Sequence, residues 1–164
     1  MSKGREIRCY DYVNHPYERV REALTKDPLA VFQSATKAAA SRARSVGSQL
    51  RVDFGGIAVQ TDIRISVKKI EEKTPVMSSP TTHLRLEWEA DKMPRIFPLM
   101  RGEIQIYALT ATETQLDFSG FYEPPLGPLG KIADAAVGHL IAEVSVHRFV
   151  NEVAEYLRQS LAQP

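Results

Sequence analysis

The spacing of hydrophobic and polar residues predicts one strand followed by two helices in the N-terminal part of the chain. Residues 6–13 alternate between apolar and polar sides, as in a strand with one exposed face. Asn14 is a candidate N-cap for a first helix, with Pro16 in its first turn and an end near Thr25. The apolar residues of this helix recur at helical spacing: Tyr17, Val20, Ala23 and Leu24.

A second helix is predicted from Asp27 to the vicinity of Gly47. Asp27 and Pro28 together place a capping residue before a proline in the first helical position. The apolar residues that follow keep a helical period: Leu29, Phe32, Ala35 and Ala39. The chain therefore begins with a strand and two short helices.

After Gly47 the apolar spacing changes to that of strands. Alternation is clear in residues 50–54, 57–67, 84–90, 103–108 and 115–122. They are separated by a Gly55–Gly56 turn, a polar loop at 71–82, an apolar loop at 93–100 and a short turn at 111–114. With residues 6–13 this makes about six strands, and an apolar face opposite a polar face is typical of an antiparallel sheet.

The last part of the chain predicts one long helix. Residues 123–130 are rich in proline and glycine, whereas residues 131–163 contain no proline. The apolar residues before His147 and those after it lie on different sides, so we expect the helix to bend or to change packing partners near Glu143. Only this helix is long enough to cover the apolar face of the sheet. The sequence thus predicts a single α+β domain over residues 1–164.

Composition and charge exclude several classes of function. Lys and Arg number 21 against 20 Asp and Glu, interspersed along the chain, which argues against a nucleic-acid partner. No apolar run reaches membrane-spanning length, and the charged N-terminus lacks the apolar stretch of a secretion signal. The lone Cys9 fits a reducing compartment. We expect a cytoplasmic protein with no cofactor and no metal; the sequence does not decide between a monomer and a homodimer.

Two segments carry a resemblance to a known superfamily. Val13–Val20 (VNHPYERV) leads into the first helix, and Tyr122–Asp134 (YEPPLGPLGKIAD) leads into the last one. With the order of predicted elements, they make the chain resemble the START-like, polyketide cyclase-dehydratase and birch-pollen-allergen (SRPBCC) superfamily over nearly its whole length. The resemblance implies the helix-grip fold, in which a curved antiparallel sheet wraps around the C-terminal helix. It also implies a cavity for lipids, polyketides or aromatic metabolites between sheet and helix.

Several residues are candidates for lining such a cavity. Trp88, Phe118 and Tyr122 fall on the apolar face of the sheet, and the Tyr122 hydroxyl is suited to bind a ligand oxygen. Small and apolar residues face them from the last helix at helical spacing, among them Ala136, Leu140 and Val144. Ordinary core packing is the alternative for both sets.

Glu143 is the candidate polar anchor of the cavity. It borders both apolar sets of the last helix and lies four residues from His139 and from His147. A buried carboxylate there would orient a ligand or act as an acid or base. The alternative is a salt bridge to a strand arginine such as Arg64 or Arg101. The spacing does not fit a metal site, because the three side chains diverge around the helix.

The loop from Met93 to Met100 is a candidate pocket mouth, formed by Met93, Phe97 and Met100.

Three functions follow from these candidates. The first is binding or transport of an apolar small molecule, the second is a cyclase- or dehydratase-type enzyme that uses the same cavity, and the third is an interaction module that contacts a protein through this loop.

Overall fold

The fold of this computed structural model is described for residues 5–49, 63–90, 99–123 and 135–162. Strand β1 (Arg5–Val13) is followed by helices α1 (Tyr17–Lys26) and α2 (Pro28–Gln49). Four strands come next: β2 (Ile63–Lys73), β3 (Thr81–Ala90), β4 (Leu99–Ala108) and β5 (Thr114–Glu123). Helix α4 (Ala135–Ala162) ends the chain.

The described strands form one antiparallel sheet in the order β1-β5-β4-β3-β2. Strand β1 therefore pairs with β5, the last strand in sequence. Strands β1 and β2 lie at the two ends of this order. The α+β class, the antiparallel sheet and the long terminal helix that the sequence predicts are confirmed. The expected strand at 50–54 lies outside the described residues.

Alternation places apolar side chains on one face of the sheet, and they are buried there. This inner face is formed by Ile65, Leu84, Leu86, Trp88, Met100, Ile104, Ile106, Leu116, Phe118 and Tyr122. A bulge between Val67 and Lys69 shifts the register of β2. As a result Ile70 lies opposite Leu84, on the same face as Ile65, although the two isoleucines are five positions apart.

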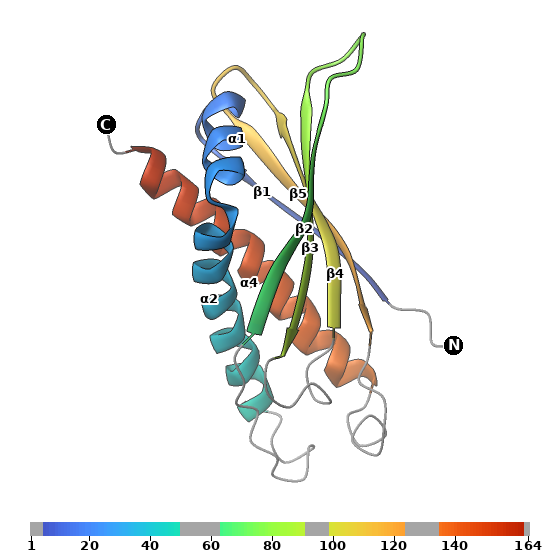
Figure 1. Ribbon diagram of the computed structural model, residues 1–164. Helices are drawn as coiled ribbons and strands as arrows, with labels where there is room; N and C mark the ends of the chain where they lie inside the picture. Colours follow the sequence, from blue (N-terminus) through green and yellow to red (C-terminus); the bar gives the residue numbers. More distant parts are fainter. Residues whose placement is uncertain (1–4, 50–62, 91–98, 124–134, 163–164) are drawn as a thin grey trace.

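Helix α4 does not cover the inner face alone. Figure 1 shows α2 and α4 on the same side of the sheet, with α2 against β2 and α4 against β1. The expectation that only the last helix covers the sheet is therefore wrong, because α2, which runs past Gly47 to Gln49, shares this role.

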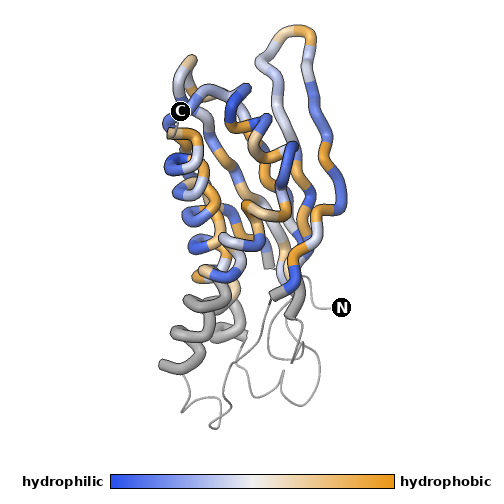
Figure 2. Tube along the Cα trace, turned by 60° about the vertical axis from the view of Figure 1, so that its left-hand side comes forward, coloured by the Kyte–Doolittle hydropathy of each residue, from blue (hydrophilic) through white to orange (hydrophobic). Residues whose placement is uncertain are grey.

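Helix α4 contributes one buried side to the hydrophobic core. This side consists of Ala142, Val146, Phe149, Val150, Val153, Ala154 and Leu157, which include all four apolar residues expected after His147. Figure 2 shows hydrophobic and hydrophilic residues recurring in turn along α4 and along the strands. Phe149 meets the sheet where its ring packs edge-on against Trp88, with 4.8 Å between centroids.

Three predicted boundaries differ from the structure. Helix α1 begins at Tyr17 with Pro16 in the N-cap position, so Asn14 is not the cap. The expected loop at 71–82 is shorter, because β2 extends to Lys73 and β3 begins at Thr81. The expected loop at 93–100 ends earlier, because Met100 lies in β4. Asp27 does cap α2, since its Oδ1 accepts a hydrogen bond from the Ala30 amide at 3.2 Å.

Candidate functional site

A groove of about 560 Å³ runs between β1 and α4. This β1–α4 groove is open to solvent, and its size suits a small organic molecule. Its walls are Cys9, Tyr10 and Asp11 from the strand and Glu143, Val144, His147, Arg148, Val150 and Asn151 from the helix. Two of the residues that the sequence proposes for ligand binding, Glu143 and Val144, therefore lie together in it.

The floor of the β1–α4 groove is apolar. Cys9, Val144 and Val150 are buried or half-buried, and Cys9 lies directly opposite Phe118 in the register of the sheet. Burial, followed by the charges of Asp11 and Asp117, raises the pKa of the Cys9 thiol to about 12. The thiol is therefore neutral at physiological pH and behaves as a small apolar side chain rather than a nucleophile.

The rim of the groove carries a carboxylate beside an imidazole. Glu143 Oε1 lies 4.0 Å from His147 Nε2, one helical turn away, and the two side chains are 47% and 56% exposed. Such a pair can accept hydrogen bonds from the polar end of a ligand and can donate a hydrogen bond to it. The arginines considered as salt-bridge partners, Arg64 and Arg101, fall on the sheet face turned away from α4, where Arg101 pairs with Glu87.

The aromatic candidates lie deeper, in the core. Trp88, Phe118 and Tyr122 are all buried on the inner face. The rings of Trp88 and Phe118 stack at 6.2 Å, and Phe149 approaches both edge-on. Met100, expected at a pocket mouth, is buried beside them, opposite Trp88 and Tyr122 in the register. The side chains of Ala136 and Leu140, together with Met93 and Phe97, lie outside the described residues.

The contribution of β1 to the groove was missed from the sequence. Cys9, Tyr10 and Asp11 belong to a strand far from α4 along the chain, and alternation alone does not say which strand a helix crosses. One local signal existed: Tyr10 is a large aromatic residue on the polar side of its strand, and it is 75% exposed.

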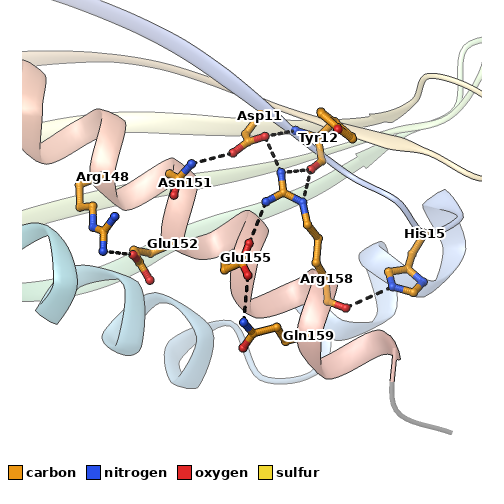
Figure 3. Close-up of polar contacts among 9 residues, drawn as sticks. All are labelled: Asp11, Tyr12, His15, Arg148, Asn151, Glu152, Glu155, Arg158 and Gln159. Atoms are coloured by element: carbon orange, nitrogen blue, oxygen red, sulfur yellow. Dashed lines mark hydrogen bonds and ion pairs between the residues drawn. The ribbon is translucent and has the colours of Figure 1, made fainter.

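A cluster of polar contacts fixes α4 against β1 (Figure 3), and two of its residues, Asp11 and Asn151, also line the groove. Arg158 donates hydrogen bonds to the backbone oxygen of Tyr12 at 2.7 and 3.1 Å and pairs with Asp11 at 2.6 Å. Asn151 also donates to Asp11, at 3.3 Å. We call Asp11, Tyr12, Asn151 and Arg158 the clasp, because they tie the helix to the edge of the sheet.

Comparisons with known proteins bear on the fold. No protein-family model matches the sequence, and no curated protein matches it either. Among solved structures, TTHA0849 from Thermus thermophilus is similar over 98% of this chain and 100% of its own, with 13% identity and a TM-score of 0.52. The chain has the helix-grip fold.

Two further solved structures are less similar to this chain. The Zhui aromatase/cyclase of a Streptomyces species shares 13% identity over 96% of this chain and 95% of its own, with a TM-score of 0.49. The protein Ara h 8.0201 shares 10% identity over 93% and 97%, with a TM-score of 0.46. At these identities the likeness concerns the fold and not the chemistry.

A second groove of this helix-grip domain, of about 610 Å³, lies mainly on the outer face of the sheet, over β1, β5 and β4. Its lining consists of Arg8, Cys9, Tyr10, Glu103, Gln105, Gln115, Asp117, Phe118, Ser119 and His147. Asp117 lies in the middle, with Tyr10 opposite it on β1 and Gln105 opposite it on β4. This outer groove shares Cys9, Tyr10 and His147 with the β1–α4 groove.

Among the described residues, no three His, Cys, Asp or Glu side chains gather closely enough to hold a metal ion. None of the described helices is long and apolar enough to cross a membrane.

Proposed function

We propose that this helix-grip protein binds an apolar or aromatic small molecule between the sheet and α4, and that the ligand enters through the β1–α4 groove. The observation that carries the proposal is the make-up of this groove: an apolar floor of Cys9, Val144 and Val150 under the Glu143–His147 pair. The floor favours an apolar body, while the pair orients a hydroxyl or carbonyl group at its end.

The predicted lining extends the site inward. Cys9 lies beside Phe118, whose ring stacks on Trp88, so an aromatic wall lies next to the groove. In this proposal Trp88, Phe118, Tyr122, Ala136 and Leu140 line the inner part of the site. Met93 and Phe97 form a second opening at the other end of the site, and Met100, which is buried beside Trp88, belongs to its lining.

Dye titration tests the proposal. We expect an apolar fluorescent dye such as 1-anilinonaphthalene-8-sulfonate to bind saturably, and Val144→Gln to weaken binding by about tenfold because a polar amide replaces part of the floor. Val76→Gln is the matched control, since Val76 is fully exposed in the turn between β2 and β3. Equal affinities of the two variants would contradict a site in this groove.

The proposed role of Glu143 as the polar anchor is tested by a separate variant. Glu143→Gln keeps the shape and removes the charge, and since Glu143 is about half exposed we expect a larger effect on ligand affinity than on stability. Thermal unfolding and dye titration of the same sample separate the two effects. A large loss of stability with unchanged affinity would assign Glu143 a structural role.

A cyclase- or dehydratase-type reaction is the second candidate. It is favoured by the 4.0 Å approach of Glu143 and His147, because a carboxylate and an imidazole so close can pass a proton to and from a substrate in the groove. A test substrate is a short poly-β-ketone, followed by the appearance of an aromatic absorption band. If the protein catalyses this step, His147→Gln slows turnover with little change in substrate affinity; a rate equal to that without protein would leave binding as the function.

A further inference from the structure

The outer groove contains one carboxylate, Asp117, whose charge no basic side chain among the described residues pairs with. Asp117 Oδ2 accepts a hydrogen bond from the Tyr107 hydroxyl at 2.7 Å, and Oδ1 accepts one from the Gln115 amide at 2.6 Å. Both donors are neutral. Within the described ranges no lysine, arginine or histidine forms an ion pair with Asp117.

Three neighbouring acidic residues on this face, in contrast, form ion pairs. Glu6 pairs with Arg8 at 2.7 Å, Glu87 with Arg101 at 3.3 Å, and Glu103 with His83 at 2.7 Å. Each of these carboxylates therefore has a basic side chain beside it. Asp117 is the exception among them, and it lies in the middle of the groove.

The two hydrogen bonds hold the Asp117 carboxylate in one orientation. Burial and the bond to Asp117 raise the pKa of Tyr107 to about 12, so this phenol stays protonated and remains a donor. Each carboxylate oxygen still has capacity to accept a second hydrogen bond. The charge is thus fixed in place and has acceptor sites left for a ligand.

An exposed aromatic ring stands next to this charge. Tyr10 is directly opposite Asp117 in the register and is 75% exposed. Gln105 borders Asp117 on the other side and adds an amide that can accept or donate. A carboxylate beside an aromatic face attracts an organic cation through both ion pairing and cation–π contact.

We propose that the outer groove is a second ligand site, which binds the protonated amine of a small organic molecule between Asp117 and Tyr10. The ammonium group donates to the free acceptor sites of Asp117, and its carbon substituents lie against the Tyr10 ring. Gln105 and Ser119 contact polar groups of the same ligand. This site is separate from the one proposed between the sheet and α4, because Asp117, Gln105 and Ser119 lie on the outer face; Tyr10 borders both grooves.

The first experiment compares two probes of nearly equal shape on the unmodified protein. Benzylamine carries a positive charge at neutral pH, whereas benzyl alcohol is neutral. We expect benzylamine to shift the backbone amide signals of Ser119 and Gln105 saturably in nuclear magnetic resonance spectra, with a Kd of about 1 mM, and benzyl alcohol to bind at least about tenfold more weakly. Added salt should weaken benzylamine binding, since the charge is open to solvent.

Variants then assign the binding to the two proposed residues. We expect Asp117→Asn and Tyr10→Ala each to weaken benzylamine binding by about fivefold or more. Glu87→Gln is the matched control, because it removes a carboxylate from the same face that is already paired with Arg101, and it should leave the affinity unchanged.

Three results would overturn the proposal: no saturable shift with benzylamine, equal binding of the two probes, or equal losses in Asp117→Asn and Glu87→Gln. The probe comparison needs no variant, so it decides the question even if Asp117→Asn fails to fold.

Discussion

At the scale of single residues, the ring of Phe118 lies across two glycines on neighbouring strands. Gly102 and Gly120 are directly opposite each other on the inner face. A Cβ at Gly102 would come 2.5 Å from Cζ of Phe118, and one at Gly120 would come 2.8 Å from its Cε1. The absence of side chains at these two positions therefore lets the ring lie close to the backbone of the sheet, where it stacks on Trp88.

Gly102→Ala should accordingly lower the free energy of unfolding by about 1–3 kcal/mol, because the added methyl group overlaps the Phe118 ring. The same change made together with Phe118→Leu should cost less, with a coupling of about 1 kcal/mol or more in a double-mutant cycle measured by urea unfolding. Strictly additive losses would show that the ring does not need the glycine.

The neutral thiol of Cys9 gives the protein a pH dependence. Its pKa is raised from 9.0 to about 12 in the folded state, so the folded chain favours the protonated thiol more than the unfolded chain does. This contribution to stability is complete below pH 9 and disappears as the pH rises toward 12.

Between pH 9 and about 11.5, we therefore expect the unfolding midpoint of the natural chain to fall more steeply than that of Cys9→Ala. Tyr107, whose pKa is also raised, is present in both proteins and cancels in the comparison. Parallel curves would rule out a perturbed thiol. Alkylation by iodoacetamide at pH 8 offers a second readout and should be at least about a hundredfold slower in the folded chain than in the denatured one.

At the scale of elements, the clasp determines how α4 lies along β1. The side chains of Arg158 and Asp11 are only 25% and 17% exposed, and Arg158 also donates hydrogen bonds to the backbone oxygen of Tyr12 in β1. Since the β1–α4 groove has one wall on each element, the clasp also holds the two walls of the groove together.

We expect Arg158→Ala to lower the free energy of unfolding by about 2 kcal/mol, because a half-buried carboxylate and a backbone oxygen lose their charged donor. Arg148→Ala is the control on the same helix: its pair with Glu152 lies on the surface, and its removal should cost at most about 0.5 kcal/mol. Chemical denaturation of both variants measures the difference. Similar losses would mean that the clasp is an ordinary surface contact.

At the scale of the whole molecule, the features that repeat along the chain were predictable. Alternation identified the strands and their apolar face, and helical spacing identified Phe149, Val150, Val153 and Leu157 as the buried side of α4. These patterns arise because each element must bury one side. Asp27 was recognised as a cap for a similar reason, since capping depends on only a few neighbouring residues.

Features that depend on contacts between distant residues were not predictable. The pairing of β1 with β5, the sharing of the inner face by α2 and α4, and the β1–α4 groove all require knowledge of which elements meet. Glu143 was identified by its place between two apolar sets, yet its position at an open rim depends on where β1 lies. Asn14 was the wrong cap because the helix begins after Pro16, and sequence patterns fix such boundaries poorly.

The central claim, that the chain binds an apolar small molecule, is tested most directly by a native mass spectrum of protein purified from its own source. We predict a folded charge-state distribution in which part of the protein carries a small added mass that organic solvent releases. A folded distribution with the bare chain mass alone, from a protein that also fails to bind apolar dyes, would contradict the claim.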